Sequence, residues 1–223
     1  MKLAIVGYGK MGRLIEQLAP EYGFTVHARI DLNDDFELAR GADAAIEFTV
    51  PDAVAENVEK LAALGVPVAV GTTGWAWQSD RVKQALEKHG TGLVWSPNFS
   101  IGVNVFTRLV REAAKLLANE PQYGAWAWEI HHHTKKDAPS GTLIKLVEEM
   151  KNGGYGHAIS IASNRAGAHP GTHEIGFDSA ADTITLRHAA RSRDGFARGA
   201  LKAAQWVIGK KGVHEFSEIL FER

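Results

Sequence analysis

The 223-residue chain contains no cysteine, which excludes disulfide bonds, thiolate metal ligands and a cysteine nucleophile. It has no apolar run approaching the roughly 20 residues that cross a bilayer, and the apolar segment after Met1-Lys2 is too short for a signal peptide. Its formal net charge of −1 gives no global attraction to nucleic acid or to an anionic membrane. We therefore expect a cytoplasmic protein that binds neither, with any selectivity for anions arising from local clusters.

The first half of the chain alternates between two hydrophobic patterns. Short apolar runs predict strands, and segments with helical spacing of apolar residues predict helices between them. The predicted strands cover residues 3–6, 24–30, 44–48, 66–70 and 93–96, and the predicted helices cover 11–19, 51–64 and 79–89. Such alternation is typical of an α/β fold with a Rossmann-like, doubly wound parallel sheet.

The pattern changes after Pro97-Asn98-Phe99. A long amphipathic helix is predicted first, followed by strands that end in a hairpin and then by a last helix. These segments are residues 103–117 (helix), 125–130, 158–163, 173–178 and 183–189 (strands) and 195–208 (helix). We predict a dinucleotide-binding domain of residues 1–99 plus 195–223, and a second α+β domain of residues 100–194 with a mixed or antiparallel sheet that binds substrate.

A glycine pattern lies between the first predicted strand and the first helix. Gly7-x-Gly9-x-x-Gly12 matches the dinucleotide fingerprint, in which the glycines permit a tight turn, close approach of a pyrophosphate and helix–sheet packing. Asp31 follows Gly12 by nineteen residues, at the end of the second strand, where a carboxylate accepts hydrogen bonds from ribose hydroxyls. This placement favours a bound dinucleotide over a plain glycine-rich turn.

The residues around Asp31 also bear on the choice of cofactor. The carboxylate would repel a 2′-phosphate, and Leu32 stands where an arginine would attract one. Arg29, two positions earlier, is able to compensate in part. NADH is therefore favoured, and NADPH stays an alternative.

The segments 71–74 (Gly-Thr-Thr-Gly) and 96–99 (Ser-Pro-Asn-Phe) each follow a predicted parallel strand. Loops at the carboxyl ends of such strands line the ligand crevice. Ordinary turn chemistry would explain these residues equally well.

Three histidines and two lysines lie within the six residues 131–136. Adjacent histidines on an extended chain point to opposite faces, so they do not easily share an ion, and we expect no metal. Ser140-Gly141-Thr142 precedes an apolar run and predicts a helix N-terminus, which attracts anions. The segment therefore predicts a pocket for a small acid that also receives a proton.

Taken together, these motifs resemble those of the dihydrodipicolinate reductase (4-hydroxy-tetrahydrodipicolinate reductase) family. The resemblance covers nearly the whole chain and rests on the glycine-rich loop, Glu47-Phe48-Thr49, residues 71–74, Asn98-Phe99-Ser100, Glu129 to Thr142, His173-Glu174-Ile175, and Ser192-Arg193-x-x-Phe196. It implies an oxidoreductase of lysine and diaminopimelate biosynthesis. The hydride of a nicotinamide cofactor would add at C4 of a cyclic dicarboxylate, and the resulting enamine would take a proton at C3.

The resemblance also implies roles for individual residues. His131 would be the general acid with Lys135 as its catalytic partner, and His132, Ser140, Gly141 and Thr142 would bind the substrate carboxylates. His133 and Lys136 would be solvated neighbours. The family acts as a homotetramer built through the sheets of its second domains. The residues expected to contact the cofactor are Gly7, Tyr8, Gly9, Lys10, Met11, Gly12, Asp31, Thr49, Gly71, Thr72, Thr73, Ser96, Pro97, Asn98 and Phe99.

The chain departs from the family where only about a dozen residues separate Asp31 from the third predicted strand. Many members have a longer segment there, and Val50 stands where a basic residue is sometimes found. Two alternatives are another NAD-dependent amino or imino acid dehydrogenase, similar to aspartate dehydrogenase, and an NAD-sensing protein without catalysis. His131 and Lys135 argue against a sensor, because a sensor needs no proton donor.

Overall fold

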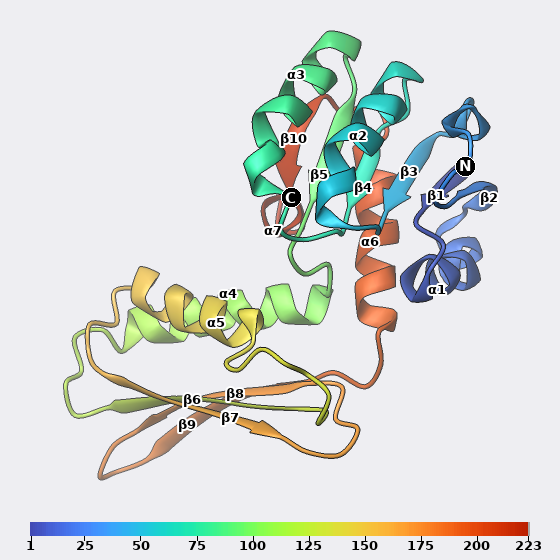
Figure 1. Cartoon of the computed structure of the whole chain (residues 1–223). Coiled ribbons are helices and arrows are strands. Elements are labelled where there is room, and N and C mark those ends of the chain that lie inside the picture. The colour runs from blue at the N-terminus through green and yellow to red at the C-terminus, as the bar shows by residue number, and fades with distance from the viewer. Residues whose placement is uncertain (223) are drawn as a thin grey trace. The chain divides into compact units, whose positions relative to one another are not determined.

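The computed structural model describes residues 1–222 of the chain. By internal contacts it divides into two compact units (Figure 1). Residues 1–101 and the segment from Asp194 onward form the first unit, and Gly102–Arg193 form the second.

The first unit is built on a parallel sheet of six strands in the order β10-β5-β4-β3-β1-β2. Its strands are β1 (Lys2–Val6), β2 (Thr25–Ile30), β3 (Ala44–Glu47), β4 (Val68–Val70), β5 (Gly92–Trp95) and β10 (Gly212–Glu215). The predicted parallel α/β sheet is confirmed. β10 and the short helix that follows it were not predicted from the sequence.

Helices cover both faces of this sheet (Figure 1). Leu3 and Ile5 of β1 face a core shared with α1 and α6, whereas Ala4 and Val6 face a core shared with α2 and α3. This alternation follows from the two-residue period of a strand, and it explains why the buried strands read as continuous apolar runs. The helices are α1 (Lys10–Leu18), α2 (Val54–Ala63), α3 (Ser79–His89), α6 (Asp194–Val207) and α7 (Phe216–Ile219).

Single 3₁₀ turns connect several of these elements. The segment between Asp31 and β3 holds one such turn, Phe36–Ala39, which begins where the Asp35 side chain accepts a hydrogen bond from the Glu37 N–H at 2.9 Å. No longer helix fits in this shortened connection. The other turns are Ala19–Tyr22, Pro51–Ala53 and Ala76–Gln78.

The second unit pairs two helices with a mixed sheet of four strands, in the order β7-β6-β8-β9. β6 pairs with β7 in parallel and with β8 antiparallel, and β8 and β9 form the predicted hairpin. One face packs on both helices around Phe106, Leu143 and Phe177. The elements are α4 (Ile101–Leu116), β6 (Gly124–His131), α5 (Gly141–Asn152), β7 (Ile159–Arg165), β8 (Thr172–Asp178) and β9 (Thr183–Ala189).

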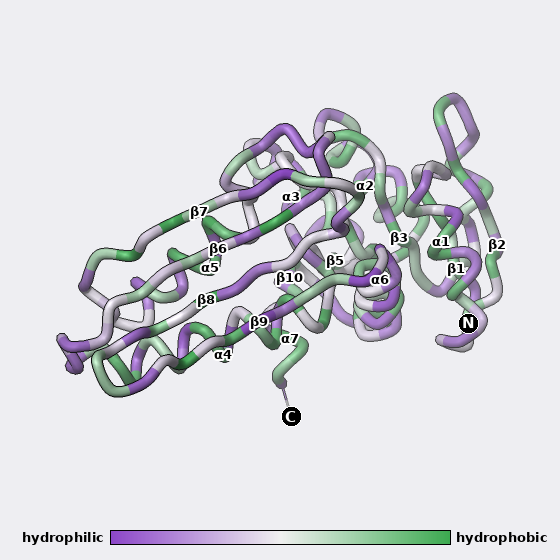
Figure 2. The backbone as a smooth tube through the Cα atoms, turned by 90° about the horizontal axis from the view of Figure 1, so that it is seen from below, coloured by the Kyte–Doolittle hydropathy of each residue, from purple (hydrophilic) through white to green (hydrophobic). Residues whose placement is uncertain are grey.

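The other face of this four-stranded sheet carries no helix (Figure 2). Trp126 and Trp128 alternate along β6 with residues of the buried face. The indole of Trp126 lies over Gly176 of β8, where an added Cβ would stand 2.0 Å from the ring. Ile161 and Ile184 of the outer strands are 48% and 40% exposed, but they pair in register with the buried Ala127 and Phe177 and so lie on the face that packs on the helices. A single chain therefore leaves uncovered a sheet face that carries Trp126 and Trp128.

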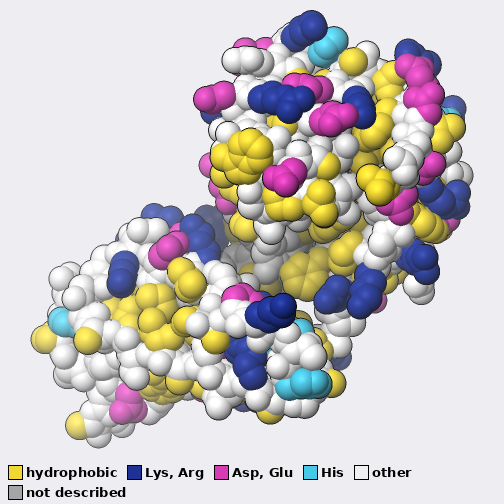
Figure 3. Space-filling model, viewed as in Figure 1, with side chains coloured by type: hydrophobic (Ala, Val, Ile, Leu, Met, Phe, Trp, Pro, Cys, Tyr) yellow, Lys and Arg dark blue, Asp and Glu magenta, His cyan; other side chains and the backbone are white. Residues whose placement is uncertain are grey.

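Charged side chains of opposite sign stand together on the face of the first unit seen in Figure 3. Lys60 pairs with Glu56 at 2.7 Å, and Arg81 pairs with Glu59 at 2.5 Å. These pairs agree with the balanced charge of the sequence. Within residues 1–222, no helix has the length and apolar character needed to cross a membrane.

Candidate active site

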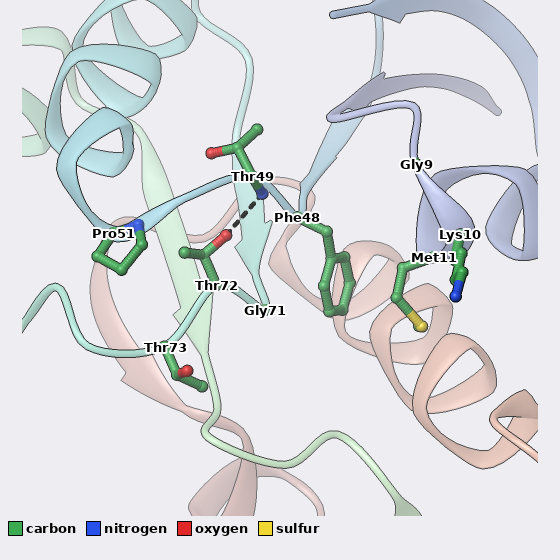
Figure 4. Close-up of a pocket in the computed structure, with 9 residues that line it drawn as sticks. All are labelled: Gly9, Lys10, Met11, Phe48, Thr49, Pro51, Gly71, Thr72 and Thr73. Carbon is green, nitrogen blue, oxygen red and sulfur yellow. Dashed lines mark hydrogen bonds between the residues drawn. The ribbon is translucent and has the colours of Figure 1, made fainter. Parts of the chain in front are cut away.

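A pocket of about 500 Å³ opens at the carboxyl ends of β1, β3 and β4 in the first unit. Figure 4 shows the ring of Phe48 standing between Gly71 and Met11. Seven of the residues expected to contact a cofactor line this pocket, namely Gly9, Lys10, Met11, Thr49, Gly71, Thr72 and Thr73. Phe48 and Pro51 line it as well, and the sequence analysis assigned neither of them a role.

The three glycines of the loop serve different purposes. A Cβ on Gly7 would stand 2.0 Å from the carbonyl oxygen of Phe48, and one on Gly12 would stand 2.4 Å from that of Gly7. Both positions are therefore required by the fold. At Gly9 an added Cβ would meet nothing within 4 Å. The space beside Gly9 faces the pocket, so its bare backbone is available to a ligand.

Gly71 makes room for the Phe48 ring at the back of the pocket. A Cβ on Gly71 would stand 2.1 Å from that ring. Beside it, the Thr49 N–H donates to the Thr72 hydroxyl oxygen at 2.7 Å, as the dashed line in Figure 4 marks. Two strand-end loops are thus locked together under the pocket.

Glu47 is fully buried at the end of β3, directly before this pocket. It accepts a hydrogen bond from the Asn57 side chain at 3.3 Å and another from the Thr49 hydroxyl. Burial raises the pKa of Glu47, and these hydrogen bonds only partly offset the effect. Glu47 therefore anchors Thr49 from below.

The Ser96–Phe99 segment forms a tight turn that does not line the pocket. The Ser96 hydroxyl donates to the Asn98 carbonyl at 2.8 Å and accepts from the Asn98 N–H at 3.1 Å. The ring of Phe99 is buried in the core, with its centroid 5.0 Å from that of Phe216. The side chain of Phe99 is consequently a packing group, and only its backbone remains for a cofactor.

Asp31 lies in an exposed turn at the end of β2. Its carboxylate accepts a hydrogen bond from the Leu32 N–H at 2.9 Å, and Leu32 itself is 86% exposed. Arg29 does not reach out toward this turn as a free cation. Its guanidinium forms a fork with the carboxylate of Glu16 on α1, with Nε 3.1 Å from Oε2.

Tyr8, the residue after Gly7, joins this pair. Its hydroxyl donates to Glu16, and the guanidinium of Arg29 lies 5.8 Å from its ring centroid. Arg29 and then Tyr8 lower the pKa of Glu16. Arg29 was considered as a group that would attract a 2′-phosphate and so compensate for Asp31. Its pairing with Glu16 opposes that role.

In the second unit, the three consecutive histidines have different surroundings. His131 ends β6 and is buried, and His132 is partly exposed with Nδ1 2.7 Å from the Thr134 hydroxyl. His133 is exposed and donates from Nδ1 to the Gly167 carbonyl at 2.9 Å. Only His131 belongs to the buried site.

Glu129 is the centre of that site. It is 0% exposed, and its Oε1 accepts hydrogen bonds from Arg165 Nη2 at 2.9 Å and from the Ser163 hydroxyl at 3.0 Å. The Ser140 N–H also donates to Oε1 at 2.9 Å, and the Ser140 hydroxyl donates to Oε2. Burial raises the pKa of Glu129, but these donors together hold it below its usual value. Glu129 is therefore a buried carboxylate in its charged form.

His131 lies against this carboxylate, with Nδ1 3.5 Å from Oε2 of Glu129. Its Nε2 faces Gly171, where an added Cβ would stand 2.9 Å away, and its ring packs edge-on against His173 at 5.1 Å between centroids. Burial lowers the pKa of His131, Glu129 opposes this, and Lys135 and Arg165 add to it. The lowered pKa favours the neutral imidazole near pH 7 and makes the imidazolium a stronger acid than that of an exposed histidine.

The loop after β6 carries Lys135, whose Nζ pairs with the Asp137 carboxylate at 2.8 Å. Arg165, which binds Glu129, also donates to the backbone carbonyl of Asp137. Lys135 is thus tied through Asp137 and Arg165 to the buried carboxylate.

Ser140 caps the N-terminus of α5. Its hydroxyl oxygen accepts from the Leu143 N–H at 3.2 Å while its proton goes to Glu129, and the residue is buried. The side chain expected to bind a substrate carboxylate is therefore already engaged on both sides. The N–H groups of Gly141 and Thr142, in the first turn, have no acceptor within the helix and point at the anion-attracting end.

Glu129, His131 and His173 offer ligand atoms within 4.8 Å of one another, a spacing that a metal ion would accept. However, the oxygens of Glu129 already accept hydrogen bonds, and the Arg165 guanidinium touches one of them. A second cation is disfavoured there, so the geometry fits a hydrogen-bonded network better than a metal centre.

Several residues of this network received no role in the sequence analysis. Their common signal is the strand register, because Glu129 pairs across the sheet with His173 on one side and Ser163 on the other. His131 pairs with Arg165 on β7. The residues concerned are Ser163, Arg165, Gly171 and His173.

Comparison with known families gives matches over both units. Residues 1–99 match the family model described as dihydrodipicolinate reductase, N-terminus. Residues 102–220 match the model described as dihydrodipicolinate reductase, C-terminus.

Curated relatives with the name 4-hydroxy-tetrahydrodipicolinate reductase match over full length. The protein from Christiangramia forsetii is 33% identical over 237 residues, covering 99% of this chain and 98% of the relative. The protein from Methanococcoides burtonii is 34% identical over 254 residues, covering 95% of each.

Among solved structures, dipicolinate-bound dihydrodipicolinate reductase from Paenisporosarcina sp. TG-14 has the same fold. It matches with a TM-score of 0.80 and 22% identity, covering 98% of this chain and 99% of that one. Aspartate dehydrogenase from Thermotoga maritima matches with a TM-score of 0.51 and 11% identity, covering 92% and 95%. At 11% identity, the similarity to aspartate dehydrogenase concerns the fold alone.

In the glycine loop, one glycine is predicted to matter for ligand binding and another for stability of the fold. Gly9→Ala should leave the thermal unfolding midpoint nearly unchanged, since its Cβ meets no atom, yet weaken NADH binding at least ten-fold, roughly the effect of losing one close ligand contact. Gly7→Ala should instead lower the midpoint, because φ is +90° and the Cβ overlaps a carbonyl. Thermal unfolding and NADH fluorescence titration measure the two effects, and unchanged NADH affinity in Gly9→Ala would contradict the assignment of the pocket.

Proposed function

The chain belongs to the dihydrodipicolinate reductase family, and we propose that it uses a nicotinamide cofactor to reduce the cyclic dicarboxylate for which the family is named. The observation that carries this proposal is the buried His131–Glu129 pair beside Lys135 and the N-terminus of α5. It unites a proton donor with groups that attract carboxylates. A cofactor-sensing protein would have no need of that combination.

The pocket of the first unit fits the cofactor. Its lining combines the bare backbone of Gly9, the start of α1 at Lys10, and the polar Thr49 and Thr73. Unpaired N–H groups at a helix start favour a pyrophosphate. When bound, the reduced nicotinamide supplies the hydride. Tyr8, Gly12 and the 96–99 turn would contribute from outside the pocket lining, and Gly7 would hold the loop in shape.

The second unit supplies the binding groups for the substrate carboxylates. The N–H groups of Gly141 and Thr142 and the Lys135 ammonium would hold one carboxylate, and His132 would approach the other. Ser140 contributes by fixing the start of α5 through its bonds to Glu129 and Leu143. We therefore assign it to positioning, in addition to the binding role implied by the family.

His131 would deliver the proton to C3 after hydride addition at C4. Burial lowers the pKa of His131 in the free protein, and the negative charge of a bound dianion would raise that pKa and so favour the protonated ring. Lys135 offsets carboxylate charge and assists the same step. A positioned acid of this kind contributes about a hundredfold or more to the rate.

His131→Gln should lower kcat by roughly a hundredfold or more with little change in NADH affinity, because the imidazole is lost and the pocket of the first unit is untouched. Steady-state rates with the freshly generated dihydrodipicolinate precursor, together with NADH titration, measure both. His133→Gln is the matched control, since that ring is exposed, and it should retain activity. Reduction of another amino or imino acid, but not of this precursor, would contradict the proposed substrate.

We also propose that NADH is preferred over NADPH. Asp31 repels a 2′-phosphate, Leu32 offers no cation, and Glu16 holds Arg29. Glu16→Ala should free Arg29 and raise the ratio of kcat/KM for NADPH to that for NADH by roughly two- to five-fold, a modest factor because the pair is exposed to solvent.

The inhibition constants of 2′,5′-ADP and 5′-AMP, each measured against the cofactor, report the preference for or against the 2′-phosphate without comparing turnover rates. Glu21→Ala removes another arginine-bound carboxylate of the first unit, which pairs with Arg198 at 2.5 Å, and should leave the ratio unchanged. The double variant Glu16→Ala/Arg29→Ala should return it to the original value. An unchanged ratio in Glu16→Ala would show that Arg29 takes no part in cofactor choice.

The uncovered sheet face supports the homotetramer implied by the family, which we propose for this chain. Sedimentation velocity should give a mass near four chains. Trp128→Glu should shift the mass toward smaller species, because it would replace an aromatic ring of the proposed contact by a charge that must lose its water. Leu116→Glu, at an exposed position near the end of α4, is the control and should leave the mass unchanged. A monomeric protein at micromolar concentration would contradict the proposal.

A further inference from the structure

Glu129 differs from the other carboxylates of the second unit in its burial and in the number of elements that meet it. β7 supplies Ser163 and Arg165, the α5 cap supplies Ser140, and β8 supplies His173, whose Nε2 lies 3.4 Å from Oε2. A carboxylate so enclosed is too deep to bind substrate. Glu129 therefore affects the reaction only indirectly, through the residues to which it is hydrogen-bonded or paired.

We propose that Glu129 is the positioning residue for the general acid, and that Arg165 couples it to the loop that carries Lys135. The inference rests on the proposed function of His131 and Lys135. It assigns to one buried ion pair the alignment of both the proton donor and the carboxylate-binding loop.

The geometry around His131 supports the first half of the proposal. Glu129 stands at the Nδ1 edge of the ring, 3.5 Å away and without a hydrogen bond in the free protein, and the Nε2 edge lies against Gly171, which has no side chain. A carboxylate at Nδ1 favours the ring form that carries a proton there, so that Nε2 faces the reacting atoms. His173 packs against the ring and limits its rotation.

Titratable groups near His131 lie on β6, β7, β8 and the loop after β6. Glu129 on β6 and Asp137 in the loop favour the imidazolium, whereas Lys135 in the loop and Arg165 on β7 oppose it. Burial, with His131 as the next cause, lowers the pKa of His173 on β8 to about 4, so this neighbour is neutral at working pH. Glu129 is the nearest anion to the ring and the group that most offsets its burial.

Arg165 supports the second half. One nitrogen, Nη2, donates both to Glu129 and to the Asp137 carbonyl, while Nη1 donates to the Asn164 carbonyl at 2.8 Å. Asp137 in turn holds the Lys135 ammonium. The guanidinium thus cancels the buried charge and pins the loop at the same time.

The test is Glu129→Gln, which keeps the size of the side chain and removes its charge. We expect kcat to fall roughly ten-fold or more, part of the contribution of a positioned acid. Without the anion the pKa of His131 falls further. Activity needs the imidazolium and declines as pH rises through that pKa, so the basic limb of the kcat–pH profile should move to lower pH.

Two readouts and a control variant distinguish positioning from damage to the fold. The KM for NADH should stay unchanged, because the pocket lies in the first unit. ¹⁵N NMR of histidine-labelled protein, with His131 assigned by its loss in His131→Gln, should show the lowered pKa directly. Glu149→Gln is the matched control and should leave kcat and its pH profile unchanged. Glu149 is also nearly buried and lies near the end of α5, where it pairs with Arg111 of α4 at 3.6 Å.

Should Glu129→Gln fail to fold, Arg165→Lys tests the same coupling. It keeps the charge but loses the forked contact, and it should raise the KM for the dicarboxylate more than it lowers kcat. An unchanged pH profile and kcat in Glu129→Gln, or an unchanged KM in Arg165→Lys, would overturn the inference. Absence of reductase activity in the unmodified protein would instead overturn the proposed function.

Discussion

The buried charge of Glu129 is the constraint on which the second unit depends. An unpaired carboxylate in a protein interior is destabilised by several kcal/mol, so the chain must bring donors to it from separate elements. Ser140, Ser163 and Arg165 meet this demand and thereby fix the start of α5, the end of β7 and the loop between β6 and α5. The shape of the proposed substrate site follows from satisfying one charge.

The fold was predictable wherever its signals are local. Buried parallel strands appear as apolar runs, and the loops after them contain glycine, proline or asparagine, so five of the strands of the first sheet were found close to their observed bounds. β10 was missed because Gly212–Glu215 has only half-buried residues and no apolar run. It becomes a strand by pairing with β5, in a register that begins at Gly212 and Gly92. Such pairing is a tertiary effect without a local signal.

The same division applies to the site. The segment from His131 to Thr142 is contiguous, and its helix start and clustered bases were legible in the sequence. The contacts of those groups could not be predicted, because Ser163, Arg165 and His173 lie 34, 36 and 44 residues from Glu129 along the chain. Only the register of β6 with its neighbours brings them together. The substrate-binding role of Ser140 stays a prediction, and the hydrogen bond from its hydroxyl to Glu129 had no local signal.

The arrangement has a consequence for how a dianion would be recognised. Arg165 cancels Glu129, and Asp137 partly cancels Lys135, so the site is close to neutral while burial keeps His131 uncharged. A dicarboxylate entering this site brings negative charge that only the α5 N-terminus and the remaining field of Lys135 offset. Protonation of His131 then becomes favourable, because an imidazolium beside an anion in a poorly solvated site is strongly stabilised. Under the proposed function, substrate binding itself therefore charges the acid that the reaction consumes, and the acid remains uncharged when no substrate is present.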